Sequence, residues 1–283
     1  MGPVGTADSI GDALGAAVDA LSAAGVDSPR LDAELLLAAA AATDRERLLA
    51  EPEAPLAPAF GRAFGGMVRR RLRREPVAYI LGRRWFRHLE LEVDRRVLIP
   101  RPETELLVEV GLEMRPRRAL EVGTGSGAVA LALAAELPGV ELTASDSSAP
   151  ALEVARANAD RLGLSERVAF FEGTLPDGEF DLLLANLPYV ADGDWDRLEP
   201  EIREWEPRQA LLAGADGLAA IRELLAAIAD RTDSGGQVAD VIALEVGAGQ
   251  ATAVAALLAE AGYAETEARA DLAGIERVVL GRR

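Results

Sequence analysis

The spacing of hydrophobic positions changes near residue 118 and divides the chain into two predicted parts. In the first part, apolar side chains recur at helical spacing, as in Ile10, Leu14 and Val18. Ser28-Pro29 is a typical start of a second helix, and Thr43-Asp44-Arg45-Glu46 has the pattern of a capping box for a third. We therefore predict a small all-α domain over residues 1–75, with a fourth helix after the proline-rich segment 51–58.

Strands and helices alternate through most of the second part, residues 101–283. Strands are predicted at residues 119–122, 140–145, 168–171, 182–185 and 238–246, and helices at 128–135, 150–162, 216–229 and 250–261. Two last strands, at 264–270 and 276–280, are predicted to pair through a turn at Ala273-Gly274. This order indicates an α/β fold with a Rossmann-like, mostly parallel, doubly wound sheet. Between the two parts, residues 76–100 are predicted to turn the chain and form a β-hairpin linker.

The apolar run at 182–185 ends in Asn186-Leu187-Pro188-Tyr189, where an open α/β sheet binds its ligands. The side-chain oxygen of Asn186 and the carbonyl of Leu187 can accept both N–H bonds of an amide or exocyclic amine, which orients its nitrogen. Pro188 has no N–H to compete, and it pushes Leu187 towards an extended conformation. Tyr189 offers a flat face for stacking. The alternative is an ordinary turn after a strand, since Asn and Pro are common turn residues.

The loop Gly123-Thr124-Gly125-Ser126-Gly127 lies between a predicted strand and a helix, and its glycines allow close approach of backbone to a ligand. Its spacing differs from the G-x-G-x-x-G of dinucleotide folds. Asp146, at the end of the next strand, can accept hydrogen bonds from both hydroxyls of a ribose. Glu121 can accept from the ammonium of an amino-acid tail. Ribose with a cationic amino acid indicates S-adenosylmethionine; the alternatives are a tight turn for the glycines and a helix cap for Asp146.

Composition excludes several kinds of chemistry. The 283 residues include no cysteine and only one histidine, His88, so neither disulfides, zinc-thiolate sites nor a histidine-based triad is expected, and no metal site is predicted. All basic residues are arginine, and the net charge of −17 argues against direct DNA binding. No apolar run reaches the ~20 residues that span a bilayer, and no signal-peptide pattern is present. We expect a soluble, cytoplasmic protein without membrane contact.

These motifs resemble those of class I S-adenosylmethionine-dependent methyltransferases that act on amide or exocyclic nitrogen. Three further stretches narrow the resemblance: residues 75–82, the block Leu98-Ile-Pro-Arg-Pro-Glu-Thr-Glu105, and Glu206-Pro207 with Ala210-Leu211. Together with the helical N-terminus, they resemble the PrmC/HemK peptide-chain release factor glutamine methyltransferases over nearly the whole chain.

The resemblance implies methyl transfer from S-adenosylmethionine to the glutamine of the Gly-Gly-Gln motif in class 1 release factors, giving N5-methylglutamine. The glutamine amide would bind Asn186 and the Leu187 carbonyl, in a pocket with Pro188, Tyr189, Arg101 and Pro102. The cofactor would bind Glu121, the loop from Gly123 to Gly127, Asp146 and Asn186. The N-terminal helices would hold the release factor away from its glutamine.

Two positions depart from the family pattern. The family usually has Asn-Pro-Pro-Tyr, whereas this chain has Leu187 at the second position, which puts affinity or rate in question but not the chemistry. Thr174 stands where related enzymes often carry an acid or aromatic near the adenine, so the adenine contact is left unassigned.

Other functions fit part of the pattern. An adenine-N6 or cytosine-N4 DNA methyltransferase uses the same motif but must bind DNA and flip a base. A glutamine methyltransferase of a large-subunit ribosomal protein, a non-catalytic S-adenosylmethionine-binding protein and an NAD-dependent dehydrogenase are further alternatives. The densest basic run, Arg69-Arg70-Arg71 with Arg73-Arg74, is either a solvated helix face or a surface for an acidic or RNA-rich partner.

Overall fold

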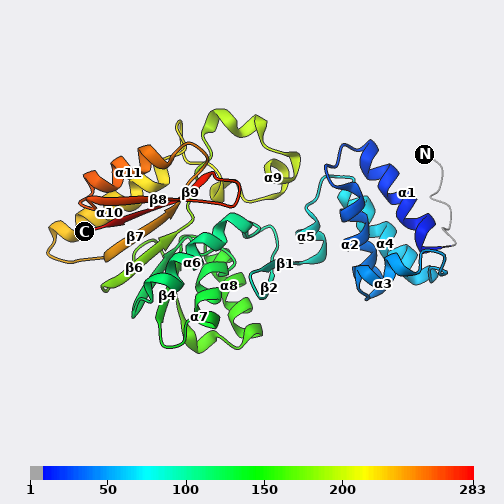
Figure 1. Ribbon diagram of the computed structural model, residues 1–283, viewed down its shortest axis with the longest axis horizontal. Coiled ribbons are helices and arrows are strands. Elements are labelled where there is room, and N and C mark those ends of the chain that lie inside the picture. The colour runs from blue at the N-terminus through cyan, green and yellow to red at the C-terminus, as the bar shows by residue number, and fades with distance from the viewer. Residues whose placement is uncertain (1–8) are drawn as a thin grey trace. The chain divides into compact units, whose positions relative to one another are not determined.

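A computed structural model describes residues 9–283 and divides them into two compact units (Figure 1). One unit combines the described residues up to Gly82 with Glu199–Trp205, and the other combines Arg83–Leu198 with Glu206–Arg283. The first eight residues of the predicted helical domain lie outside the described part of the chain. The predicted hairpin belongs to the second unit.

The helical unit forms because amphipathic helices bury one face around a shared core. It contains α1 (Ile10–Ala23), α2 (Pro29–Ala41), α3 (Arg45–Ala50), α4 (Pro58–Arg71), α5 (Val77–Leu81) and α9 (Pro200–Trp205). Leu21, Leu36 and Leu37 are fully buried, and Phe64 packs against the same cluster from α4. The unit therefore has a hydrophobic core of its own.

The helix α2 begins at Pro29 as predicted, but two expected capping contacts are absent and one expected turn contains a helix. The side chain of Ser28 makes no capping hydrogen bond at the start of α2. The predicted capping box does not form, because the Thr43 amide closes the end of α2 on the Ala38 carbonyl and α3 starts after Asp44. The expected turn before the hairpin contains α5, which ends at Gly82 with a left-handed φ of 71°.

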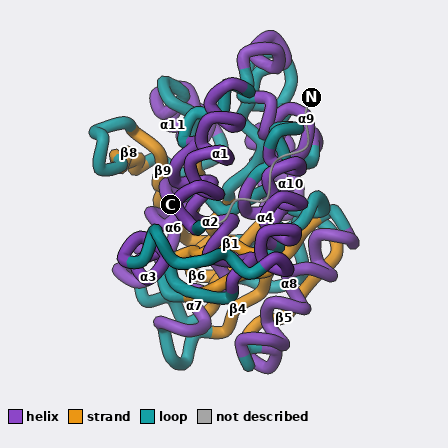
Figure 2. The backbone as a smooth tube through the Cα atoms, turned by 90° about the vertical axis from the view of Figure 1, so that its right-hand side faces the viewer, coloured by secondary structure: helices purple, strands orange, loops and turns teal. Residues whose placement is uncertain are grey.

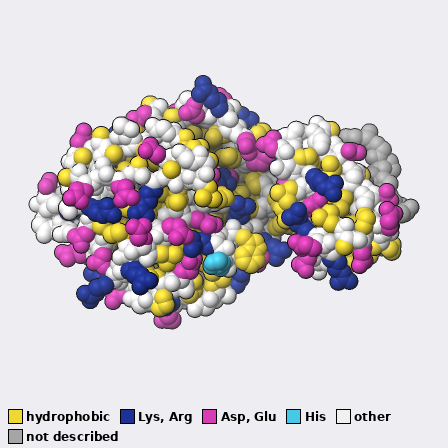
Figure 3. Space-filling model, in the orientation of Figure 1, with side chains coloured by type: hydrophobic (Ala, Val, Ile, Leu, Met, Phe, Trp, Pro, Cys, Tyr) yellow, Lys and Arg dark blue, Asp and Glu magenta, His cyan; other side chains and the backbone are white. Residues whose placement is uncertain are grey.

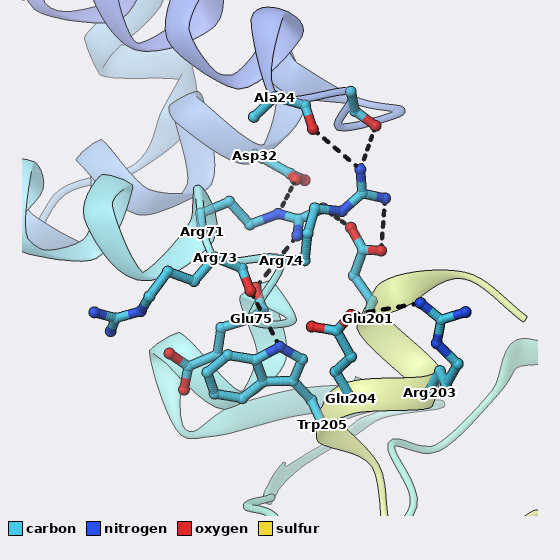
Figure 4. Close-up of polar contacts among 11 residues, drawn as sticks. Ala24, Asp32, Arg71, Arg73, Arg74, Glu75, Glu201, Arg203, Glu204 and Trp205 are labelled. Carbon is cyan, nitrogen blue, oxygen red and sulfur yellow. Dashed lines mark hydrogen bonds and ion pairs between the residues drawn. The ribbon is translucent and has the colours of Figure 1, made fainter.

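Two arginines of the run at the end of α4, Arg71 and Arg74, form ion pairs inside the helical unit (Figure 4), so the run is not a wholly solvated face. Arg71 is buried and pairs with Asp32 and with Glu201, each at 2.7 Å. Arg74 pairs with the second oxygen of Glu201 at 2.6 Å, and Arg70 pairs with Glu75. Two carboxylates, one from α2 and one from α9, therefore hold the guanidinium of Arg71.

The α9 segment joins the helical unit although the preceding strand belongs to the sheet. Besides the Glu201 pairs, the indole N–H of Trp205 donates to the Arg73 carbonyl at 3.2 Å (Figure 4). The exposed members of the run are Arg69 and Arg73. These contacts fix both ends of α9 on the α4 side of the unit.

The second unit contains a seven-stranded sheet of order β5-β4-β3-β6-β7-β9-β8. Its strands are β3 (Arg118–Val122), β4 (Glu141–Asp146), β5 (Val168–Glu172), β6 (Phe180–Ala185), β7 (Ala239–Glu245), β8 (Glu265–Ala270) and β9 (Glu276–Arg282). The first five strands in this order pair in parallel, and β9 pairs antiparallel with both β7 and β8. In the sheet, β3, β4 and β5 follow one another to one side, and β6 and β7 follow one another to the other side, so the strand order switches between β3 and β6. The crevice between the carboxyl ends of these two strands is therefore the expected place for a ligand.

Helices cover both faces of this sheet (Figures 1 and 2). On one face α6 (Glu105–Met114), α7 (Ala128–Glu136) and α8 (Ala149–Leu162) pack against Leu182 and Leu184 of β6. On the other, α10 (Ala219–Asp233) and α11 (Ala251–Glu260) pack against Leu183 and Ala185. The unbroken apolar run of β6 arises because successive side chains point to opposite, equally buried faces.

A hairpin of β1 (Arg83–Phe86) and β2 (Leu89–Glu92) precedes the sheet, with His88 at its turn. Within residues 9–283, no helix is both long and apolar enough to cross a membrane, and no group of three or more His, Asp or Glu side chains is placed to hold a metal ion. Acidic and arginine side chains are interspersed on the face drawn in Figure 3.

Candidate active site

The carboxyl ends of β3, β4 and β6 meet at one edge of the sheet and line a cavity of about 560 Å³. This volume lies within the usual range for small-molecule sites. Most of the residues predicted for cofactor and substrate lie together in its lining: Arg101, Glu121, Gly123, Thr124, Gly125, Ser126, Asp146, Asn186, Leu187 and Pro188. Three predicted residues are not in the lining, namely Gly127, Pro102 and Tyr189.

The glycine loop after β3 needs glycine for its backbone. Gly123, Gly125 and Gly127 have left-handed φ values of 76°, 55° and 85°. A Cβ atom on Gly123 would lie 3.2 Å from the Leu187 side chain and 3.4 Å from the Asn186 carbonyl. The loop thus lies directly against the segment that follows β6. Gly127 has a structural role, because it is the N-cap residue of α7.

Asp146 organises the end of β4 through both carboxylate oxygens. One accepts the amide N–H of Gly125 and the other that of Ser148, each at 2.9 Å. Ser148, and not Asp146, is the side-chain cap of α8. A carboxylate oxygen has more than one acceptor position, so Asp146 keeps acceptor capacity towards the cavity that it lines.

Glu121 is an acidic residue in the middle of the core, 4% exposed, where the cavity reaches β3. One oxygen accepts from the Thr124 hydroxyl at 2.6 Å and from the Ala130 amide at 2.9 Å. Burial raises the pKa of Glu121 to about 7, and these hydrogen bonds only partly oppose the rise. A cation bound beside this carboxylate would remove the desolvation penalty of its charged form.

Asn186 follows directly after β6 and has an oriented side chain. Its Nδ2 atom donates to the Thr104 hydroxyl oxygen at 3.0 Å. Within residues 9–283 no donor bonds the Oδ1 atom of Asn186, and the residue lines the cavity. Thr104 is buried at the end of the short helix η1 (Pro102–Thr104). In the sequence Thr104 belongs to the motif block Leu98–Glu105, and no role at the site was predicted for it.

Arg101 and Glu206 form a second polar pair at the cavity. The guanidinium of Arg101 bonds the buried carboxylate of Glu206, which also accepts the Ile99 amide N–H at 3.0 Å. The neighbouring Pro102 is exposed in η1. Glu206 had no role assigned from the sequence beyond its place in the family motif, and the structure shows that it fixes the segment that carries Arg101.

Tyr189 is held by its backbone. Its carbonyl accepts a hydrogen bond from the Gln250 side chain at 3.0 Å, and Gln250 also accepts the Gly247 amide N–H at 2.8 Å. Burial is the largest cause that raises the pKa of the Tyr189 hydroxyl. Sequence reasoning missed Gln250, which ties the segment after β6 to the loop between β7 and α11.

Comparison with known proteins agrees with this geometry. Residues 12–82 match the family model described as the PrmC N-terminal domain, and residues 119–205 match that of a methyltransferase domain. The catalytic domain of hMettl16, solved in complex with MAT2A 3'UTR hairpin 6, has a TM-score of 0.53 at 14% identity over 69% of this chain and 75% of that one. At this identity the likeness shows the fold, and it confirms the predicted α/β class.

Two relatives match almost end to end. The release factor glutamine methyltransferase of Caulobacter vibrioides is 41% identical over 274 residues, covering 94% of this chain and 93% of the relative. The protein of the same name from Geobacter sulfurreducens is 40% identical over 268 residues, covering 93% and 92%. The resemblance indicated by the motifs is confirmed: this chain belongs to the release factor glutamine methyltransferase family.

Proposed function

We propose that this chain transfers a methyl group from S-adenosylmethionine to the side-chain amide nitrogen of the glutamine in the Gly-Gly-Gln motif of class 1 peptide-chain release factors. The observation that carries the proposal is the oriented amide of Asn186 beside the glycine loop: its nitrogen donates to Thr104, and no donor among residues 9–283 bonds its oxygen at the cavity. The names of the relatives favour a release factor as the substrate. We expect the reaction to take place in the cytoplasm.

The residues at the cavity fit an S-adenosylmethionine molecule, which supplies the methyl group. A Cβ atom on Gly123 would come within 3.2 Å of Leu187 and 3.4 Å of the Asn186 carbonyl, so glycine at this position lets the loop lie close to the Asn186 segment. Asp146 keeps acceptor capacity for ribose hydroxyls, and Glu121 offers a buried carboxylate to an ammonium group. The raised pKa of Glu121 supports this role, because a buried acid near neutrality is stabilised by a bound cation.

The polypeptide would act mainly by orientation. Asn186 Oδ1 and the Leu187 carbonyl accept the two N–H bonds of the substrate amide, and this directs the nitrogen lone pair at the methyl carbon. Bound S-adenosylmethionine would supply the methyl group from its sulfonium sulfur, and the amide nitrogen held by Asn186 and Leu187 would take it and then release one proton to water. Holding the reacting atoms in line is worth several powers of ten in rate, and no strong base is required.

Leu187 replaces the family's usual proline but keeps the backbone carbonyl that would accept one N–H bond of the substrate amide. Its side chain packs against the core cluster of the α10 and α11 face and contacts the position of Gly123. Packing of Leu187 therefore takes over part of the restriction that a proline ring would give to this backbone. Pro188 lines the cavity beside it.

Transfer of labelled methyl groups to purified release factor tests the proposal. The matched controls are a Gly-Gly-Ala variant of the factor, duplex DNA, and the Asn186→Ala variant of the enzyme. Label on the factor, absent from its Gly-Gly-Ala variant and reduced at least about 100-fold by Asn186→Ala, is the expected result. Label on DNA alone, or full turnover by Asn186→Ala, would refute the assignment.

A further inference from the structure

The segment that follows β6 is bonded at both of its ends to residues from elsewhere in the chain. At its start, Asn186 Nδ2 donates to the Thr104 hydroxyl oxygen at 3.0 Å. At its end, the Tyr189 carbonyl accepts a hydrogen bond from Gln250 Nε2 at 3.0 Å. Leu187, whose carbonyl would accept one N–H bond of the substrate amide, lies between these two points. The direction of that carbonyl therefore depends on how firmly both ends are held.

The hydrogen bonds of Gln250 fix the orientation of its carboxamide. Its Oε1 atom accepts the Gly247 amide N–H at 2.8 Å, and its Nε2 atom donates to the Tyr189 carbonyl. A backbone N–H can only donate and a backbone carbonyl can only accept, so the reverse orientation would satisfy neither group. Gln250 is also the N-cap residue of α11, and its own N–H donates to the Gly247 carbonyl at 3.1 Å. The side chain that bonds Tyr189 therefore starts from a fixed backbone.

The peptide unit between Tyr189 and Val190 is bonded at both of its polar atoms. Its carbonyl oxygen accepts from Gln250, and its N–H donates to the Leu211 carbonyl at 2.9 Å. Rotation of the peptide plane would break at least one of these bonds. Without the Gln250 side chain, the plane would be held at its N–H alone.

Two glycines leave room for the Gln250 carboxamide beside Tyr189. A Cβ atom on Gly217 would overlap the Tyr189 carbonyl oxygen and lie 2.7 Å from Gln250 Nε2. A Cβ atom on Gly247 would lie 2.9 Å from Gln250 Oε1 and 3.2 Å from the Tyr189 ring. Gly247 has no left-handed φ, so its neighbours and not its backbone require glycine there. The contact between Gln250 and Tyr189 is therefore closely packed.

Leu187 is the point at which this segment can still rotate. The ring of Pro188 fixes its own φ, whereas the φ of a leucine is free to turn. Within residues 9–283, neither the N–H nor the carbonyl of Leu187 has a hydrogen-bond partner. With Asn186 bonded on one side and the Tyr189 carbonyl on the other, a rotation at Leu187 would displace one of the two bonded groups.

We infer that Gln250 is a positioning residue, which acts through the Tyr189 carbonyl to keep the Leu187 carbonyl directed at the substrate amide. The inference rests on the proposed function, since it names what holds one of the two acceptors of that site. Gln250 restricts from outside the segment the rotation that a proline at position 187 would restrict from within. The two restrictions should therefore substitute for each other.

The test combines variants of Gln250 and Leu187 in the full chain. Gln250→Met removes both side-chain hydrogen bonds at similar length. Gln250→Glu keeps an oxygen for the Gly247 N–H, but its carboxylate has no proton to donate to Tyr189. Leu187→Pro fixes the φ at which the segment can rotate. Each Gln250 change is made in the wild-type chain and in the Leu187→Pro variant.

Three measurements separate positioning from a general loss of structure. Methyl transfer to whole release factor gives kcat and KM, and calorimetry gives the affinity for S-adenosylmethionine. Hydrogen exchange of peptides that cover residues 186–190 reports whether the Val190 amide is still protected. Gln237→Met is the matched control, because Gln237 is an exposed glutamine outside the cavity lining.

Both Gln250 variants should lower kcat about 10- to 100-fold, because a displacement of about 1 Å at the reacting groups can cost about 100-fold in rate. Exchange at Val190 should become faster, while cofactor affinity should stay within about threefold of wild type, since Gln250 does not line the cavity. Leu187→Pro alone should keep kcat within about threefold of wild type, and in that variant the Gln250 changes should cost less than about threefold. Gln237→Met should match wild type in every measurement.

The inference would be overturned by a wild-type kcat in either Gln250 variant, or by equal fold losses with and without Leu187→Pro. An inactive Leu187→Pro variant would contradict the equivalence of the two restrictions, and a loss of cofactor affinity equal to the loss in kcat would show a general structural role. Failure of the wild-type enzyme to label any release factor would refute the proposed function itself, and the inference with it. The wild-type arm therefore separates the two failures.

Discussion

Removal of the Arg71 side chain is expected to destabilise the helical unit strongly. Arg71 is 6% exposed, and its guanidinium lies between Asp32 and Glu201, each at 2.7 Å. In Arg71→Met the apolar stem is kept, but the buried carboxylate of Asp32 loses its cation. Glu201 remains paired with Arg74 at 2.6 Å. The penalty should therefore come mainly from Asp32.

The magnitude follows from the burial of both partners. Breaking a buried ion pair by removing one member costs about 3–5 kcal/mol, because a charge is left without compensation. Replacing the whole pair by apolar groups is often neutral. Arg71→Met should thus cost about 3–5 kcal/mol, whereas Arg71→Met combined with Asp32→Leu should return to within about 1 kcal/mol of wild type.

Hydrogen exchange followed by mass spectrometry measures this in the full chain, since it reports on the α2 and α4 amides separately from the sheet. A loss of 3 kcal/mol corresponds to exchange that is faster by a factor of about 100 or more. The double variant should restore protection, and α10 and α11 amides serve as the internal control. Wild-type protection in Arg71→Met, or no recovery in the double variant, would refute the reasoning about uncompensated charge.

Two further predictions concern the cofactor. Asp146→Ala should weaken S-adenosylmethionine binding about 10- to 100-fold, since hydrogen bonds to a charged group are worth about 1.5–3 kcal/mol each; unchanged affinity in calorimetry would refute the ribose assignment. Burial raises the pKa of Glu121 from 4.5 to about 7. Between these two pH values the folded chain without cofactor holds a proton that the unfolded chain has released. The free energy of unfolding should therefore fall by about 3 kcal/mol as the pH rises from 4.5 through 7. Urea unfolding at pH 5 and pH 8 measures this fall, and the fall should be smaller in Glu121→Gln. A fall of equal size in Glu121→Gln would exclude Glu121 as its cause. Cofactor affinity, in contrast, should rise with pH in the wild type.

The sheet and the main motifs were predictable because each depends on local pattern. The apolar run of β6 requires burial on both faces, and the position of Asn186 at its end follows from that. The glycine loop and Asp146 likewise stand at the ends of strands that the sequence identifies. In a parallel sheet such ends converge, so the cavity edge could be predicted without coordinates.

The remaining contacts depend on register and on tertiary neighbours. One sequence does not reveal that β7 lies beside β6 and brings Glu245 behind Asn186. Nor does it reveal that α9, which follows the sheet's own residues, joins the helical unit and supplies Glu201 to Arg71. The sequence shows a run of arginines at the end of α4, and only the fold shows that Arg70, Arg71 and Arg74 are paired whereas Arg69 and Arg73 are exposed.

The buried acids of this chain fall into two groups with opposite consequences. Asp32 is compensated by a buried arginine, so its charge is part of the stability of the helical unit. Glu121 and Glu245 lie at or near the ends of β3 and β7 and form no ion pair within the described residues 9–283, and burial raises the pKa of each to about 7. Neutral substitution of Asp32 should therefore lower stability, whereas Glu121→Gln should raise stability at pH 8 and lower activity. That opposition is expected where carboxyls are retained for a site despite their cost to the fold.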